Sequence, residues 1–297
     1  MVAGSDRAAA SFTQRIYYAA GKDADNDILD SAALYDPASD SHTDLPSMST
    51  VRTYFGMGRL GALVCAVGGM DASGTILDSC ECLDAASTGA GWSAISSLGT
   101  ARSRHAVAST GDTMCAIGGM DASWNFFASV ECLSQGAATW VEVAALNTAR
   151  SHHGAAAVGD VIFVVGGQDG TILSSVEALD LGADGGGWEE KAPMPTGRQQ
   201  LAVAAYGTKL FAVGGYGGNR LNELEIYDSA TDSWSAAAPM PTARNGLAAA
   251  IVGNTLLALG GSGAGDTLEA YDIEGGSWSA AEPMATPRKY FAAVAGP

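Results

Sequence analysis

The segment LFAVGGYGGNRLNELEIYDSATDSWSAAAPMPTAR, residues 210–244, carries the pattern that decides the fold of this 297-residue chain. A hydrophobic run ends in a glycine pair, Glu-x-Tyr-Asp and a tryptophan follow, and Pro-Met-x-x-x-Arg closes the segment. Its apolar runs are short and are separated by turn residues, and none reaches the roughly 10 to 12 residues that an amphipathic helix needs. The segment therefore predicts a small sheet of short strands.

The same landmarks return along the chain at intervals of 44 to 50 residues, and the glycine pairs at intervals of 46 to 50. The glycine pairs are Gly68-Gly69, Gly118-Gly119, Gly166-Gly167, Gly214-Gly215 and Gly260-Gly261, with Gly21-Lys22 as a degenerate copy. The tryptophans are Trp92, Trp140, Trp188, Trp234 and Trp278, with His42 near the expected place in the first copy. The arginines are Arg52, Arg102, Arg150, Arg198, Arg244 and Arg288. A fixed period of this length indicates a repeat architecture.

The last copy shows how four strands follow one another. GLAAAIVG (residues 246–253) predicts a first strand, Gly253-Asn254 a tight turn, and TLLALGG (255–261) the hairpin partner. TLEAYD (267–272) and the stretch around SWSAAEPM (277–284) predict the third and fourth strands. One such sheet has two open edges and an unburied face, so the copies must stack. We predict an all-β fold, a six-bladed β-propeller with four antiparallel strands per blade.

The chain ends predict how the ring closes. The first copy begins at RIYYAAG (residues 15–21), a second-strand sequence, and the chain finishes with PRKYFAAVAG (287–296), a first-strand sequence. We therefore expect residues 288–296 to complete the first blade of a propeller that spans residues 15–297, after a tail of residues 1–14. Residues 7–12 offer a weaker alternative, because they lie two residues short of the usual offset from the arginine to the glycine pair.

Together these landmarks resemble the kelch repeat, and the resemblance covers residues 15–297. It is weakest in the first copy, where Lys22, Ala33 and His42 replace the second glycine, the glutamate and the tryptophan. The resemblance implies that the repeated Glu, Tyr, Trp and Arg are mainly architectural. We expect the glutamates to be satisfied by backbone donors or by the repeated arginines, because a partly buried carboxylate needs such partners. These residues are Glu81, Glu131, Glu177, Glu225 and Glu269.

Residues that differ from copy to copy indicate a binding face. Antiparallel pairing places the start of each first strand and the end of each second strand on one side of the ring. Two residues after the repeated arginines stand Tyr54, Arg104, His152, Gln200, Gly246 and Tyr290. The loops after the glycine pairs add Asp71, Trp124, Gln168, Tyr216 and Arg220. Variation on a repeated frame is what a specific site would show, so we predict that a partner binds on this face.

Two of these residues carry more detailed expectations. Trp124 is either an interface anchor at a loop tip or a side chain that packs down onto its own blade. Arg220 matches a loop position that kelch adaptors of cullin ubiquitin ligases use to hold acidic peptides. The resemblance thus implies a positive patch of Arg104, His152 and Arg220.

Charge and hydropathy exclude several kinds of partner. The formal net charge is -17, and the 15 basic residues are scattered singly, so no basic stripe is available for nucleic acid or anionic lipid. No run of about 18 uncharged apolar residues could span a membrane. The first 14 residues lack the apolar block of a secretory signal, so we expect a cytoplasmic protein.

The five cysteines give no sign of a disulfide framework. Cys65 and Cys115 share one repeat position, at which the other copies carry Tyr18, Phe163, Phe211 and Leu257. Cys82 and Cys132 share a second position, which Ala178 and Ile226 occupy elsewhere. We expect these four cysteines to be unpaired core residues in a reducing compartment, and Cys80 has no equivalent in the other copies.

No catalytic or metal-binding constellation stands out. His105 and His153 replace Phe or Leu of other copies and are expected in the core, so no zinc or copper set can be assembled. The glycine-rich turns lack the setting of a phosphate loop, and we expect no cofactor and no catalysis. The resemblance implies a scaffold that binds a protein or peptide, such as a ubiquitin-ligase substrate adaptor or a cytoskeletal protein. The alternative is a sugar-handling kelch enzyme such as a sialic acid mutarotase, and a copper oxidase like galactose oxidase is less favoured.

Overall fold

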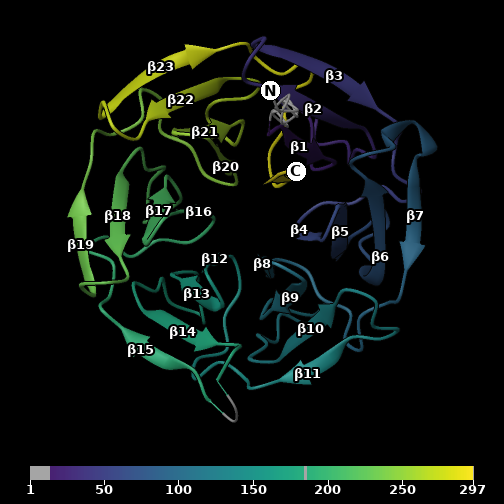
Figure 1. Cartoon of the computed structure of the whole chain (residues 1–297), viewed down its shortest axis with the longest axis horizontal. Helices are drawn as coiled ribbons and strands as arrows, with labels where there is room; N and C mark the ends of the chain where they lie inside the picture. The colour runs from purple at the N-terminus through teal and green to yellow at the C-terminus, as the bar shows by residue number, and fades with distance from the viewer. Residues whose placement is uncertain (1–13, 184–185, 297) are drawn as a thin grey trace, which may run out of the picture.

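Six four-stranded antiparallel sheets stand around one axis in the computed structural model, which describes residues 14–183 and 186–296. Figure 1 shows these sheets as blades of a ring, and the predicted six-bladed all-β propeller is confirmed. Within the described residues, helical structure is limited to one 3-10 turn, Thr88–Ala90.

The first three blades contain twelve strands. Blade one is made of β24 (Ala292–Ala295), β1 (Ile16–Ala19), β2 (Ala32–Asp36) and β3 (Ser41–Leu45). Blade two is made of β4 (Gly56–Leu60), β5 (Leu63–Met70), β6 (Ile76–Asp84) and β7 (Trp92–Ile95). Blade three is made of β8 (Ala106–Thr110), β9 (Thr113–Ile117), β10 (Val130–Ser134) and β11 (Val141–Val143).

The other three blades repeat this order from the axis outward. Blade four is made of β12 (Gly154–Val158), β13 (Val161–Val165), β14 (Val176–Asp180) and β15 (Glu189–Lys191). Blade five is made of β16 (Ala202–Tyr206), β17 (Lys209–Val213), β18 (Leu224–Asp228) and β19 (Ser233–Ala236). Blade six is made of β20 (Ala248–Val252), β21 (Thr255–Leu259), β22 (Leu268–Asp272) and β23 (Ser277–Ala281).

The C-terminal strand closes the ring as predicted. β24 pairs antiparallel with β1, so that Ile16 faces Ala295 and Ala19 faces Ala292. Beyond the strand, the Gly296 N–H donates to the Arg15 carbonyl at 2.7 Å. In Figure 1 the yellow end of the chain therefore lies inside the purple first blade. The alternative closing segment, residues 7–12, lies outside the described residues.

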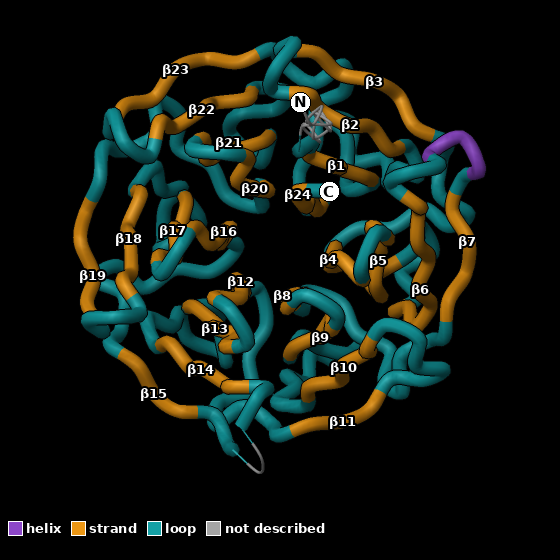
Figure 2. Tube along the Cα trace, in the orientation of Figure 1, coloured by secondary structure: helices purple, strands orange, loops and turns teal. Residues whose placement is uncertain are grey.

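The innermost strand of each blade lies nearest the axis, as Figure 2 shows, and small residues let these strands approach one another. A Cβ atom added to Gly56 of β4 would lie 2.3 Å from Val107 Cγ2 of β8, in the next blade. Gly154 of β12 has the same relation to Val203 of β16. Larger side chains at these positions would push neighbouring blades apart, so the small residues after each repeated arginine are a packing requirement.

The repeated arginines and glutamates form buried ion pairs within blades two to six, which confirms the structural role expected for the glutamates. In blade two, Arg52 Nη2 donates to Glu81 Oε1 at 2.7 Å, and Arg52 Nη1 donates to the Gly68 and Ser79 carbonyls. The Ser49 N–H donates to the other Glu81 oxygen, so the pair also fixes the preceding loop. The other pairs are Arg102–Glu131, Arg150–Glu177, Arg198–Glu225 and Arg244–Glu269.

Blade one replaces this ion pair with a different arrangement. Ala33 stands where the glutamate would be. Arg288 Nη1 keeps the two carbonyl bonds of the other blades, to Ala20 and Ser31, and Nη2 donates to the Ser31 hydroxyl at 2.8 Å. The Arg288 guanidinium also lies 5.4 Å from the centre of the Tyr18 ring. Burial raises the pKa of Tyr18 to about 12. In blade one, the cation therefore lies over a neutral aromatic ring and has no carboxylate at its Nη2 edge.

The outer strands are joined by ring N–H groups that donate to the preceding blade. Trp92 Nε1 donates to the Pro46 carbonyl at 2.9 Å, and the other four repeated tryptophans do the same. His42 Nε2 lies 2.9 Å from the Glu282 carbonyl, so it carries the hydrogen, and Nδ1 accepts from the Tyr18 hydroxyl. His42 is therefore a working substitute for the missing tryptophan.

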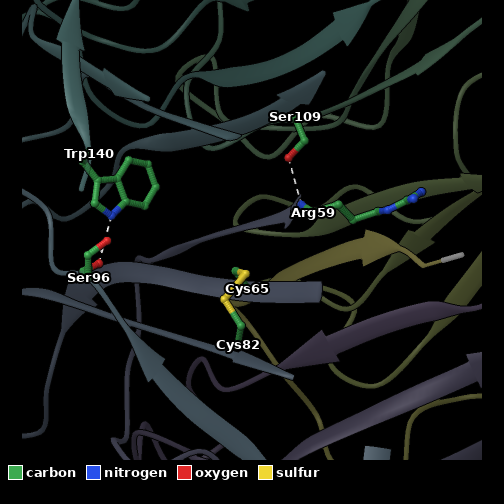
Figure 3. The surroundings of a disulfide bond; sticks show 6 residues. All are labelled: Arg59, Cys65, Cys82, Ser96, Ser109 and Trp140. Carbon is green, nitrogen blue, oxygen red and sulfur yellow. Dashed lines mark hydrogen bonds between the residues drawn. A yellow bond between two sulfur atoms is a disulfide. The ribbon is translucent and has the colours of Figure 1, made fainter. Parts of the chain in front are cut away.

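Two disulfides overturn the expectation of unpaired cysteines. Cys65 of β5 is bonded to Cys82 of β6, and Cys115 of β9 is bonded to Cys132 of β10. Figure 3 shows the first bond between the two middle strands of its blade. The two repeat positions are directly opposite in the strand register, which brings the cysteines together. Cys80 is free and buried, and burial raises its pKa to about 11.

No helix within residues 14–183 and 186–296 has the length and apolar character needed to cross a membrane.

Candidate functional site

The predicted binding face contains a closed ring of backbone hydrogen bonds around the axis. The residues two places after the repeated arginines each donate their N–H to the carbonyl of the equivalent residue in the preceding blade. Around the circle, these residues are Tyr54, Arg104, His152, Gln200, Gly246 and Tyr290, and the six N···O distances run from 2.7 to 3.1 Å. We call this set the mouth ring. It holds five of the predicted site residues side by side.

The mouth ring has a backbone conformation that favours glycine. Tyr54, Arg104, His152, Gln200 and Tyr290 have φ between 54° and 55°, and Gly246 has φ of 61°. A non-glycine residue in the left-handed region costs on the order of 1–3 kcal/mol and persists only where the surroundings enforce it. Here the closed ring of hydrogen bonds enforces it, and strain of this kind is common at binding sites.

Aromatic and cationic side chains stack along one side of the mouth ring. The Tyr290 and Tyr54 rings lie 4.6 Å apart between centroids. The Arg104 guanidinium lies 4.5 Å from the Tyr54 centroid and 4.8 Å from the Trp124 centroid. Trp124 keeps 62% of its surface exposed. It therefore packs against Arg104 of its own blade and also presents an open aromatic face, and its role as an interface anchor stays a prediction.

The other side of the mouth ring is amide-rich and neutral. The Gln168 side chain reaches from its loop to His152, with 3.1 Å between Nε2 and the ring Nδ1. Burial, and next the charge of Arg104, lower the pKa of His152 to about 3. His152 is thus uncharged at neutral pH and cannot contribute to the positive patch expected with Arg104 and Arg220. The Asn245 amide donates to Gln200 Oε1 in the adjoining blade.

Tyr216 and Arg220 lie over a polar hollow of about 490 Å³ beside the mouth ring. Gln200 and Tyr290 line it from the ring, and Arg220 Nη2 lies 3.3 Å from the Ser262 hydroxyl. The remaining lining residues are Gln199, Gly218, Asn219, Asn245 and Ser262. The hollow is thus lined by amides, hydroxyls and one guanidinium.

Asp71 has no described contact with the mouth ring and, unlike Tyr216 and Arg220, does not line the polar hollow beside it. Its carboxylate accepts from the Ser73 hydroxyl and from the Ser73 and Thr75 N–H groups, which holds the loop together. These hydrogen bonds, the one from the Ser73 side chain first, lower the pKa of Asp71. Asp121 makes the same backbone bonds in the next blade. The repetition indicates a turn-forming role.

Two lysines complete the face and were not predicted from the sequence. Lys22 and Lys289 pair through their backbones, and Lys22 Nζ lies 5.5 Å from the Tyr54 centroid. Burial, then the charges of Lys289 and Arg104, lower the pKa of Lys22. The spacing predicts Gly21-Lys22 as the degenerate glycine pair, but the structure places Ala20 and Gly21 at that position, and Lys22 at the position of Gln168 and Tyr216. Lys289 stands one residue after its arginine, where the sequence predicts no site residue. Their position next to the variable residues was the available signal.

The basic residues of the face lack carboxylate partners. Within the described part of the chain, salt bridges involve Lys191, Arg15 and the buried repeated arginines of blades two to six. Four cations outside this set lie on the mouth face, namely Lys22, Arg104, Arg220 and Lys289. In a chain with 32 acidic residues, unpaired cations gathered on one face indicate affinity for anionic groups.

Beneath the mouth ring, the next residue of each blade is buried and mostly apolar. His105 and His153 occupy this layer with Phe55, Leu201, Leu247 and Phe291, as expected. Burial, then the charge of Arg102, lower the pKa of His105 to about 3, and burial lowers that of His153 even more clearly. Both rings are therefore neutral core side chains.

The described residues that line the two hollows of the mouth face include no aspartate or glutamate. Among residues 14–183 and 186–296, no three His, Cys, Asp or Glu side chains come close enough to hold a metal ion. The side chains of the mouth face can bind and orient a ligand through charge, aromatic stacking and hydrogen bonds from side-chain amides.

Fold and face together define a six-bladed β-propeller with a cationic and aromatic rim. The sequence profile of the kelch motif matches residues 101–147, 149–195, 197–241 and 243–285, which are blades three to six. These matches cover more than half of the chain, so the chain belongs to the kelch-repeat family. Among proteins of curated function, none matches the sequence significantly.

Proposed function

We propose that the chain is a non-catalytic interaction module that binds an acidic protein segment on the mouth face. The observation that carries this proposal is the Arg104 guanidinium held between the Tyr54 and Trp124 rings with no carboxylate partner in the described structure. Stacking leaves the edge of a guanidinium free to donate to a carboxylate in a bidentate manner.

Charge around this pair supports an acidic ligand. Lys22 and Arg104 lie near the same Tyr54 ring, Lys289 pairs with Lys22, and Arg220 lies over the polar hollow beside the mouth ring. Trp124 offers the kind of exposed aromatic surface that often anchors an interface. Amides from Gln200 and Asn245 can satisfy the backbone of a bound segment. A role as a ubiquitin-ligase adaptor would add a second binding domain or chain to this module.

Two further expectations belong to the proposal. Binding of a cytoskeletal partner is an alternative within the same class of scaffold, and nucleic acid and membrane remain unfavoured by the net charge of -17. The cytoplasmic location stays a prediction, and the two disulfides weigh against it, because such bonds persist mainly in oxidising compartments.

A displayed library of random peptides tests the proposal. Selected peptides should carry several Asp or Glu residues, and calorimetry should show Arg104→Ala and Trp124→Ala weakening binding about tenfold or more. Binding should also weaken as salt rises from 50 to 200 mM. Lys209→Ala is the matched control, because Lys209 begins β17 at the opposite end of blade five. Unchanged affinity in both mouth variants would refute the proposal.

The sugar-handling alternative predicts a different result. Sialic acid would then bind the wild-type protein, and its anomers would equilibrate faster in the presence of the protein. Either result, together with failure to select acidic peptides, would refute the scaffold proposal and favour a sugar-handling enzyme.

A further inference from the structure

The central channel holds an arginine that neither the fold nor the mouth face uses. A hollow of about 310 Å³ lies between the six innermost strands, and all six contribute residues to it. Seven residues after each repeated arginine, the register places Arg59, Ser109, Ala157, Ala205, Ile251 and Ala295 in its lining. The arginine is the only charged residue among the described residues of this lining.

The Arg59 guanidinium is poorly satisfied within the protein. Nε is buried and has no hydrogen-bond partner among the described residues. Nη2 makes one long contact, 3.5 Å, to the Gly61 carbonyl in the turn after β4. Figure 3 shows the side chain extending away from the disulfide of its own blade. A guanidinium has five donors, so most of its capacity remains available.

A hydroxyl in the adjacent blade adds a second donor. The Arg59 backbone N–H donates to Ser109 Oγ at 2.8 Å. This bond occupies an acceptor site of the hydroxyl and leaves its hydrogen free to donate. The bond also shows that this N–H points away from the β4–β5 ladder. The amides of Ala157, Ala205 and Ala295 have the same register against their neighbouring strands, so their N–H groups point the same way.

We propose that the end of the channel away from the mouth ring binds a small oxyanion, a carboxylate or a phosphate group, between Arg59 and Ser109. The alanine walls exclude competing charge and strengthen the attraction between the guanidinium and an anion. A volume near 310 Å³ is at the lower end of ligand pockets, which suits a small anion with its waters. The site is separate from the mouth face, because the mouth ring and the buried layer beneath it intervene.

Calorimetric titration with inorganic phosphate and with citrate, against chloride at equal ionic strength, tests the site. The wild-type protein should bind at least one of the two, and the better ligand identifies the phosphate or the carboxylate chemistry. Arg59→Ala should weaken binding at least tenfold, and Arg59→Lys should weaken it several-fold, because lysine keeps the charge and loses the fork. Ser109→Ala should give a smaller loss.

The chain offers its own controls for folding. Alanine stands at the Arg59 register in three other blades, so Arg59→Ala is expected to fold, and its melting temperature without ligand checks this. Lys209→Ala removes a cation that lines neither the channel nor the mouth face, so this variant should bind the probe like the wild-type protein. Equal binding by the wild-type and Arg59→Ala proteins, or no binding of either probe by the wild-type protein, would overturn the proposal.

Discussion

Two buried histidines show how a single residue can make the stability of the ring depend on pH. His105 and His153 are neutral in the folded protein, and the pKa of His105 is about 3. An unfolded histidine has a pKa near 6.5, so below that pH the unfolded state takes up protons that the folded state refuses. Stability is therefore full above about pH 6.5 and falls as the pH drops toward 3.

The double change His105→Leu and His153→Leu should flatten this dependence. Leucine occupies the same layer at Leu201 and Leu247, so the variant should fold. Between pH 7.5 and pH 5 the wild-type protein should lose about 2 kcal/mol for each of His105, His152 and His153, and the variant should keep only the loss that belongs to His152, whose pKa burial also lowers to about 3. Urea unfolding at the two pH values measures the difference. Phe55→Leu is the control in the same layer and should retain the wild-type pH dependence.

At the scale of strands, the ring depends on the pairing of β24 with β1. Deleting residues 288–297 removes β24 together with Arg288, and leaves the edge of β1 open in the first blade. The melting temperature should fall by ten degrees or more, on the order of several kcal/mol of lost stability. A thermal melt followed by circular dichroism measures it.

Deletion of residues 1–13 is the matched control, because it removes the other segment that the sequence offered for closure. This deletion should leave the melting temperature nearly unchanged. A large loss for the N-terminal deletion, with none for the C-terminal deletion, would contradict closure by β24.

The two disulfides give a second prediction at this scale. In denaturant without a reducing agent, a thiol reagent should detect one free thiol per chain, that of Cys80, and five after reduction. Each bond closes a loop with a sequence separation of 17, so chain entropy alone predicts a loss of roughly 3 kcal/mol on reduction. Five thiols before reduction would show that the bonds do not form.

Sequence repetition predicts which residues occupy equivalent positions in the blades, but it does not predict which of these positions lie close together in space. Repetition predicts the strands and the partners of the glutamates because they lie within one blade, and it predicts the closure because the two chain ends supply complementary parts of one repeat. The sequence places the cysteines at two repeat positions, but it does not show the register of β5 against β6, which sets Cys65 opposite Cys82. Contacts between blades were equally hidden, so the nearness of Lys22 to Arg104 could not be foreseen.

The candidate site was predicted best where one backbone rule governs every blade. The mouth ring follows from its fixed offset to the repeated arginine, and five predicted residues lie in it. Asp71 stays a prediction, because a loop aspartate that accepts from its own backbone has the same sequence signal as one that binds a ligand. Arg59 lies outside the rim that the variable positions predict, and the alanines at its register in three other blades are the sequence signal that marks it as unusual.

For the whole molecule, closure gives all six blades the same four-stranded sheet, so the fold does not require the chain to begin and end in blade one. Gly296 and Arg15 are hydrogen-bonded neighbours, so a linker of about four residues could join them. A chain opened at the turn between Gly207 and Thr208 would again begin with a second strand and end with a first strand. We expect this circular permutant to fold with a similar circular dichroism spectrum and a melting temperature within several degrees of the wild type. Failure of that permutant to fold would show that blade one has a special part in assembly.

In the mouth ring, the backbone hydrogen bonds hold the structure together, and the side chains are left to determine which ligand binds. The six positions of the ring have φ values from 54° to 61° whether they carry tyrosine, arginine, histidine, glutamine or glycine. Main-chain groups alone hold the circle, so exchanging one of these side chains leaves the scaffold beneath it intact. Such a frame allows ligand preference to change during evolution one blade at a time, without a new fold and with little risk to the old one.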